Sequence, residues 1–248
     1  MHKMITIHSF SEIDFCWDQK TLVLVDVDST LIVPKNPILH PRAFSSYKHV
    51  VRDLFETISR EQKHLLNHSI VAQPAMIVEN LSVGWIQNMQ NNQIPIVAIT
   101  AAKKGWFDQS RTDFHHIRFA QLKEQGIDFS IHCYPDQEFK SLSPTYGDYP
   151  AMINGIIYSC GLDNSKGDVL HELLKVYSDF ERIVLIDDKM KHLESISAML
   201  SEQFSKIEFL GFHYQGADLL TTQSLVLEEI FKEYLCSLIL KAKQVVCV

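Results

Sequence analysis

The segment LVLVDVDST, residues 22–30, is an apolar run that ends in two closely spaced aspartates, Asp26 and Asp28. Consecutive apolar residues bounded by polar ones are typical of a strand buried on both faces of a sheet. In an open parallel sheet, ligands bind beyond the carboxyl ends of the strands. The two aspartates therefore mark a candidate site, provided that neighbouring strands end in suitable partners.

Short apolar runs are spread along the chain: Thr21–Val25 (which overlaps the segment above), Ile94–Ile99, Ile153–Tyr158, Arg182–Ile186 and Ile207–Phe212. Longer stretches with helical character separate them, namely Leu81–Gln93, Thr112–Gln125, Asp168–Tyr177 and His192–Phe204. This alternation predicts an α/β fold, with a Rossmann-like three-layer α/β/α core around a mainly parallel sheet.

Two segments break the alternation. Cys133–Asn154 is expected to be an irregular loop or hairpin. The other, residues 32–75, opens with a loop that contains three prolines and continues as a polar helical stretch, Ala43–Asn67. We expect a small helical insert at residues 32–75, in a core formed by residues 1–31 and 76–248. The apolar stretch Leu225–Lys243 is expected to be a packing helix within the second part of that core.

Composition excludes several classes of protein. The net charge of −7 over 248 residues predicts no broad attraction to nucleic acid or anionic lipid. Five cysteines without a CxxC pair argue against a disulfide framework or a zinc site. The sequence shows neither a conventional signal peptide nor an apolar run of membrane-spanning length, so we expect a soluble, cytoplasmic protein, with export by another route left open. His115 and His116 fall in a predicted helix, where adjacent residues face different ways, so we expect no shared metal there.

Polar residues follow two further predicted strands. Asp187 and Asp188 come directly after Arg182–Ile186, and Thr100 follows Ile94–Ile99. A single aspartate at a strand end is usually a turn former or helix cap. Two strands that both end in paired carboxylates would repel each other unless a cation were bound. Mg²⁺ fits, because it prefers hard oxygen ligands.

Such a site is suited to phosphoryl transfer. A carboxylate such as Asp26 can attack phosphorus to form an aspartyl-phosphate, while a second carboxyl, Asp28, protonates the leaving oxygen and then activates water. Donors for the phosphoryl oxygens are also needed, and Thr100 and a lysine are natural suppliers. We expect Lys166, which lies where a helix begins, over Lys175, Lys189 and Lys191, although a lysine is most often a solvated surface residue.

The ordered set of these residues resembles the haloacid dehalogenase-like (HAD) hydrolase superfamily. DVDST at 26–30 matches its first motif, DxDx(T/V), and the later motifs are matched at Thr100, Lys166 and the pair Asp187-Asp188. Dehalogenases of the superfamily lack the second aspartate of the first motif, so the resemblance implies a phosphatase. Ser29 departs from the pattern, since many members have glycine there.

The resemblance implies a role for each matched residue. Asp26 would be the nucleophile and a Mg²⁺ ligand, and Asp28 the general acid/base and a ligand through its backbone carbonyl. Asp187 and Asp188 would complete the metal site. Thr100 and Lys166 would hold the phosphoryl group, with Thr30, the residue usual in phosphatases, among the substrate-binding residues.

The position of the insert is that of a C1 cap in this superfamily. Because it is short, it resembles the caps of members that act on large substrates such as phosphoproteins. GIIYSCG at 155–161 and GFHYQG at 211–216 resemble an uncharacterised branch from intracellular bacterial pathogens, which implies delivery into a host cell and phosphotyrosine protein as the substrate. Two alternatives stay open: a phosphatase of small molecules such as nucleotides or sugar phosphates, and a non-catalytic binding module of the same fold.

Overall fold

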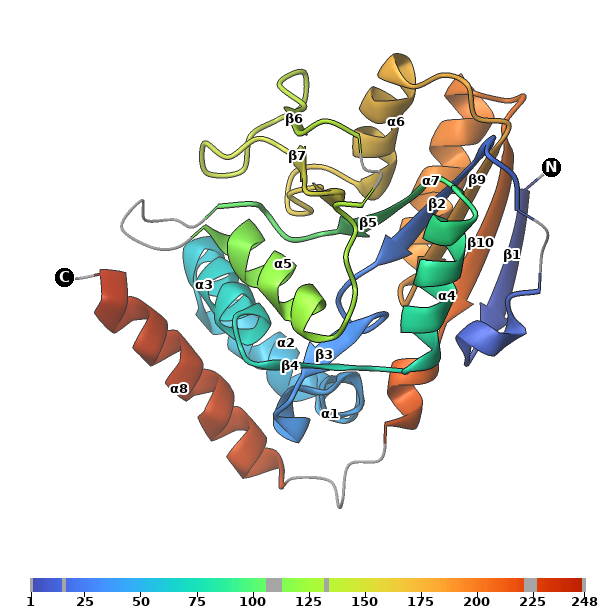
Figure 1. Cartoon of the computed structure of the whole chain (residues 1–248). Helices are drawn as coiled ribbons and strands as arrows, with labels where there is room; N and C mark the ends of the chain where they lie inside the picture. The colour runs from blue at the N-terminus through green and yellow to red at the C-terminus, as the bar shows by residue number, and fades with distance from the viewer. Residues whose placement is uncertain (1, 15–16, 106–112, 132–133, 221–226, 247–248) are drawn as a thin grey trace.

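The computed structural model describes residues 2–14, 17–105, 113–131, 134–220 and 227–246 (Figure 1). Within these residues, an eight-stranded sheet forms the centre. Its order is β1 (His2–Ile7), β10 (Glu208–Tyr214), β9 (Arg182–Asp187), β2 (Thr21–Asp26), β5 (Ile96–Thr100), β8 (Ile156–Tyr158), β7 (Ala151–Ile153) and β6 (Gln137–Glu138). Neighbouring strands from β1 to β8 pair in parallel, whereas β7 and β6 pair antiparallel. The predicted α/β class with a mainly parallel sheet is confirmed.

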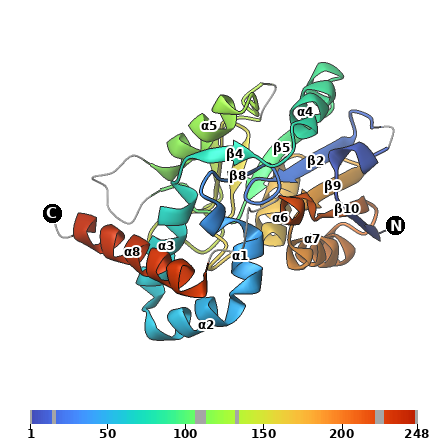
Figure 2. The same cartoon turned by 90° about the horizontal axis from the view of Figure 1, so that it is seen from below.

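Helices cover both faces of the sheet, as Figure 2 shows. In β2, Val23 and Val25 share a buried cluster with residues of α4 (Leu81–Asn91) and α5 (Phe114–Glu124). Leu22 and Leu24 belong to the opposite cluster, with residues of α6 (Lys166–Val176) and α7 (Met190–Gln203). Successive strand residues point to opposite faces, so a strand covered on both faces must be apolar throughout. This explains the continuous apolar run before Asp26.

The run Ile153–Tyr158, which we expected to be one strand, is a tight hairpin. β7 and β8 are joined by Asn154 and Gly155, whose φ angles are +52° and +73°. Asn-Gly is the preferred pair for a two-residue turn that needs positive φ at both positions. At Gly155 a Cβ atom would lie 2.1 Å from the carbonyl oxygen of Phe129, so a larger residue does not fit.

The insert begins where β2 has ended and forms a small unit of its own. It consists of β3 (Ile32–Pro34), the 3₁₀ turn η2 (Pro37–Leu39), α1 (Pro41–Ser46), α2 (Lys48–Thr57), α3 (Arg60–Val71) and β4 (Ala75–Ile77). β3 and β4 pair antiparallel, with Ile32 opposite Ile77, so the chain leaves and returns through one two-stranded ribbon. Two further 3₁₀ turns, η1 (Phe10–Glu12) and η3 (Gly216–Leu219), lie near the start and end of the core.

The last helix, α8 (Glu228–Val246), packs on the insert, although the expected division placed it in the core. Figures 1 and 2 show it running beside α2 and α3. Phe231, Leu235, Leu238 and Ile239 of α8 share a buried cluster with apolar residues of η2 and α1–α3. The reason is apolar burial: the insert cannot cover its own outer face. Among the helices of the described residues, none is both long and apolar enough to cross a membrane.

Candidate functional site

Three neighbouring parallel strands, β9, β2 and β5, end at one edge of the sheet. Asp187 is the last residue of β9, Asp26 the last of β2 and Thr100 the last of β5. All three are at least 97% buried. The parallel register therefore brings together groups that are far apart in the sequence, as the positions of the apolar runs predicted.

Lys166 lies between the two buried aspartates. Its Nζ atom forms an ion pair with Asp26 Oδ1, lies 2.6 Å from Asp187 Oδ2 and donates to the carbonyl oxygen of Ile99 at 3.0 Å. The side chain is only 1% exposed. The surface position usual for a lysine is thus excluded for Lys166.

The start of α6 fixes where Lys166 lies. Ser165 caps the helix through a reciprocal pair of hydrogen bonds with Asp168, so Lys166 occupies the first helical position. Gly167 packs against α7, where a Cβ atom would lie 2.7 Å from the carbonyl oxygen of Ser195. A glycine at this position lets α6 approach α7 closely enough to hold Lys166 under the strand ends.

Asp28 lies beyond the strand, in the turn that leads to the insert. Its side chain is 35% exposed. Thr100 Oγ1 donates to Asp28 Oδ2 at 3.0 Å, and Arg118 of α5 forms an ion pair with Asp28 Oδ1. The next residue, Ser29, has φ +68°, a conformation that glycine adopts more readily than serine. The departure from glycine noted in the sequence therefore leaves the turn in the left-handed conformation.

Charges and burial set the ionisation of the aspartates. Burial by itself would raise the pKa of Asp187, but the attraction of Lys166 and the hydrogen bond from His192 outweigh it and lower this pKa to about 2. Burial raises the pKa of Asp26 well above its ordinary value, against the attraction of Lys166 and with the repulsion of Asp187. Burial raises the pKa of Asp188 to about 6, with Asp187 adding to the shift and Lys189 opposing it. Carboxylates crowded in this way repel one another, and a further cation beside them would relieve that repulsion.

Two observations bear on a metal at this edge. Ligand atoms of Asp26, Asp187 and His192 lie within 4.8 Å of one another. Asp188 Oδ1 is buried and accepts no hydrogen bond from the described residues. His192 Nδ1 lies 2.9 Å from Asp187 Oδ1, so this nitrogen is engaged by the carboxylate, while the carboxylate oxygens of the aspartates remain possible ligands. A hard divalent cation such as Mg²⁺ suits such oxygens. The side chain of Thr30, also fully buried, donates to Asp26 Oδ2 at 3.1 Å and holds it in place.

A cavity of about 510 Å³ opens between the strand ends and the insert. We call its polar side the cavity floor, formed by Asp26, Asp28, Arg118, Asp188 and Lys189. We call the apolar side supplied by the insert the cavity roof, formed by Leu39, Phe44, Ile70 and Val71. A volume of this size suits a small organic ligand with a charged end.

Sequence reasoning missed Arg118, which contacts Asp28 directly. It is 2% exposed and belongs to the predicted helix Thr112–Gln125, but to no motif. A signal was available: Phe114, Arg118 and Leu122 are spaced four apart, which places the arginine on the buried face of the helix between two apolar residues. A charge at such a position needs a partner. His192, which contacts Asp187, was missed as well, and Lys189, which contacts Asp188, had been ranked below Lys166.

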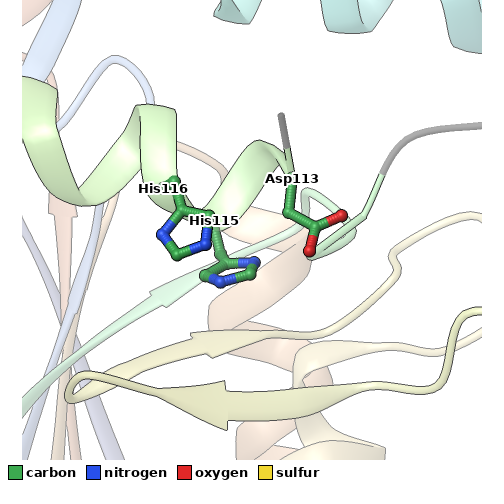
Figure 3. Close-up of side chains that lie close together, drawn as sticks. All are labelled: Asp113, His115 and His116. Atoms are coloured by element: carbon green, nitrogen blue, oxygen red, sulfur yellow. The ribbon is translucent and has the colours of Figure 1, made fainter. Parts of the chain in front are cut away.

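Asp113, His115 and His116 gather at the start of α5, apart from the cavity lining (Figure 3). Their ligand atoms lie within 4.8 Å of one another, and the two imidazole rings are 4.0 Å apart. The expectation that adjacent helical residues point apart is wrong here, because no preceding helical turn restricts the side chains of a first turn.

Comparison with known proteins finds relatives in one bacterial genus. The chain is 28% identical over 137 residues to the uncharacterized protein RP295 of Rickettsia prowazekii, an alignment that covers 53% of the chain and 45% of RP295. It is 23% identical over 207 residues to the uncharacterized protein RC0398 of Rickettsia conorii, covering 80% of the chain and 69% of that protein. The chain thus spans about half the length of RP295 and of a similar Rickettsia felis protein.

No solved structure matches the chain. A family of proteins described as "Protein of unknown function (DUF2608)" matches residues 6–235, which is most of its length. The chain therefore belongs to the DUF2608 family.

Proposed function

We propose that this protein is a Mg²⁺-dependent phosphatase of the haloacid dehalogenase-like type, which hydrolyses phosphomonoesters through an aspartyl-phosphate on Asp26. The observation that carries the proposal is the buried Lys166 amine between Asp26 and Asp187, at the carboxyl ends of adjacent strands. Burying three charges together is costly in a purely structural role. At a phosphoryl-transfer site, the same arrangement supplies a nucleophile and a cation for the phosphate oxygens.

Each side chain has a step in the proposed reaction. An Asp26 oxygen forms a bond to phosphorus as the bond to the leaving oxygen breaks, and Asp28 gives its proton to that oxygen. In the second half, Asp28 takes a proton from water, whose oxygen attacks phosphorus and releases phosphate and free Asp26. Lys166 and Thr100 hold the phosphoryl oxygens. The Thr100 hydroxyl donates a hydrogen bond to Asp28 in this structure, so its O–H bond has to rotate toward the phosphoryl oxygen when phosphate binds.

The side chains of Asp26, Asp187 and Asp188 and the backbone carbonyl of Asp28 would hold the Mg²⁺ ion. The buried Asp188 Oδ1, which accepts no hydrogen bond from the described residues and has Lys189 Nζ at 3.9 Å, and the raised pKa values of Asp26 and Asp188 favour a cation there. When bound, Mg²⁺ would offset the repulsion between the carboxylates and the phosphate.

The test is hydrolysis of p-nitrophenyl phosphate with and without Mg²⁺ by the wild type, Asp26→Asn and Asp53→Asn. Asp53 is an exposed aspartate of α2 and serves as the matched control. We expect activity that requires Mg²⁺, is lost in Asp26→Asn and is unchanged in Asp53→Asn. An Asp26→Asn variant as active as the wild type would rule out the nucleophile. Mg²⁺ binding without turnover of any phosphomonoester would instead favour the non-catalytic module.

Two substrate classes are compatible with this chemistry. Phosphotyrosine protein is the first, on the resemblance of the short insert to open caps. A small organic phosphate is the second, and the cavity of about 510 Å³ with its apolar roof favours it. Comparing kcat/KM for phosphotyrosine, phosphoserine and phosphothreonine peptides with that for a panel of nucleotide and sugar phosphates separates the two classes.

A further inference from the structure

Arg118 connects Asp28 to a second residue of α5. One terminal nitrogen of its guanidinium pairs with Asp28 Oδ1, and the other donates to Gln121 Oε1 at 2.7 Å. Both side chains are buried, with exposures of 2% for Arg118 and 7% for Gln121. The planar guanidinium fixes the directions of its two bonds, which a flexible lysine would not do.

Gln121 continues the chain of hydrogen bonds to the insert. Its Nε2 atom donates to the carbonyl oxygens of Val71 at 3.1 Å and Gln73 at 2.7 Å. These carbonyls lie between the end of α3 and the start of β4, where the insert returns to the core. We call residues 71–77 the return segment. A continuous set of hydrogen bonds thus runs from Asp28 through Arg118 and Gln121 to the return segment.

Asp28 is held at both of its oxygens, but one of these contacts cannot persist during the reaction. A hydroxyl has one proton to donate. When Thr100 donates that proton to a phosphoryl oxygen, it no longer donates to Asp28 Oδ2. Oδ2 then becomes free to give or take a proton, while Arg118 still holds Oδ1.

We infer that Arg118 is a positioning residue for Asp28, and that Gln121 ties it to the return segment of the insert. The inference rests on the proposed function, because it concerns the acid of that reaction. Arg118 keeps the carboxyl oriented after Thr100 has turned away, so that Asp28 transfers its proton through Oδ2. Gln121 anchors the guanidinium on the side opposite Asp28.

The experiment compares two substrates that differ in their need for an acid. Phenyl phosphate has a poor leaving group and depends on protonation, whereas p-nitrophenyl phosphate has a far better one. A positioned general acid contributes about 10²–10⁴-fold in rate. We expect Arg118→Met to lower the ratio of kcat for phenyl phosphate to kcat for p-nitrophenyl phosphate at least about tenfold, in the same direction as Asp28→Asn. Arg118→Lys, which keeps the charge but not the two-way bridge, should fall between wild type and Arg118→Met.

Gln121 and Gln125 provide a matched pair for the second half of the inference. Both connect α5 to the return segment, because Gln125 Oε1 also accepts a hydrogen bond from this segment, from the backbone N–H of Ile77 at 3.2 Å. Of the two glutamines, Gln121 is the one that is hydrogen-bonded to Arg118. Gln121→Leu should lower the ratio, less than Arg118→Met, whereas Gln125→Leu should leave it unchanged. The effects of Arg118→Met and Gln121→Leu should not add, because both break one network.

Several results would overturn the inference. Equal losses of kcat on both substrates in Arg118→Met, with a lowered melting temperature, would show a merely structural arginine. An unchanged ratio would do the same. If Arg118→Met does not fold, the ratio in Arg118→Lys and Gln121→Leu decides.

A wild type inactive on both substrates would refute the proposed function, and amide hydrogen exchange then tests the network alone. Gln121→Leu and Arg118→Lys should both speed exchange in residues 28–32 and 71–78. Unchanged exchange there would refute the network.

Discussion

The cavity floor and the cavity roof are built on different physical grounds. The floor consists of charged groups at or just beyond the ends of β2 and β9 and in α5, and each is held by an ion pair. The roof consists of apolar side chains of the insert, backed from outside by α8. The comparison shows that ion pairs hold the charged side chains of the floor in place, whereas burial of apolar surface holds the roof in place. Substitutions in the two regions should therefore have different consequences.

The largest effect is expected at Lys166, which pairs with Asp26 of the floor. In Lys166→Met, two buried carboxylates lose their common cation, so the free energy of unfolding should fall by about 3–5 kcal/mol without metal. The proposed phosphatase activity should fall by at least about 10²-fold. Urea unfolding and kcat measurements check this. Lys175→Met, on the exposed side of the same helix, should change the free energy by less than about 0.5 kcal/mol. A Lys166→Met protein as stable as the wild type would mean that charge balance does not govern the floor.

The next effect concerns the support of the roof. Phe231 of α8 is fully buried against Phe44 and Tyr47, so Phe231→Ala should lower the free energy of unfolding by about 3 kcal/mol. Because the floor is untouched, kcat for p-nitrophenyl phosphate should change little. Lys232→Ala, at the exposed neighbouring position, is the control. A fall of kcat as large as that in Lys166→Met would contradict the separation of floor and roof.

A smaller effect is expected from pH in the metal-free protein. Burial raises the pKa of Asp188 to about 6 in the folded state, above the value of about 4 in an unfolded chain. The fold thus favours protonated Asp188. The stability that the protonated Asp188 carboxyl contributes is fully present below a pH of about 4 and is lost as the pH rises through about 6. Between pH 4 and pH 7 in EDTA, the free energy of unfolding of the wild type should fall by about 2 kcal/mol more than that of Asp188→Asn. Urea midpoints measure the difference, and equal slopes for the two proteins would refute the shift.

The smallest effect is expected in the turn after Asp28. Ser29 has φ +68°, so Ser29→Gly should relieve strain and raise the free energy of unfolding by up to about 1 kcal/mol. Ser45→Gly, inside helix α1, should lower it by about 0.5–1 kcal/mol. Thermal unfolding of both variants is the measurement. Losses of equal size would show that the turn is not strained.

The sequence predicted the floor better than the roof, for a physical reason. A strand buried on both faces needs a continuous apolar run, and the polar residue that ends it marks the sheet edge. Asp26 of the floor, and the strand-end residues Thr100 and Asp187, could be placed in this way. The position of α8 depends on which apolar face lacks a partner, and this is decided by the assembled fold.

Two local features escaped prediction although signals existed. Asn154-Gly155 is a strong turn pair, but the apolar residues on both sides suggested one strand. Arg118 matches no motif, and its importance follows from burial and from the meeting of α5 with the turn at Asp28. β1 was also missed, because this edge strand is mostly exposed or half-buried and lacks a continuous apolar run.

The packing of α8 on the insert has a consequence for biosynthesis. The helices α1–α3 leave the ribosome well before α8, which follows them by more than 150 residues. Until α8 arrives, the apolar face that receives Phe231 and Leu235 stays open to solvent and to other nascent chains. A chain whose synthesis stopped shortly before α8 would thus have a complete candidate site but an insert with exposed apolar side chains, and chaperones should recognise it there.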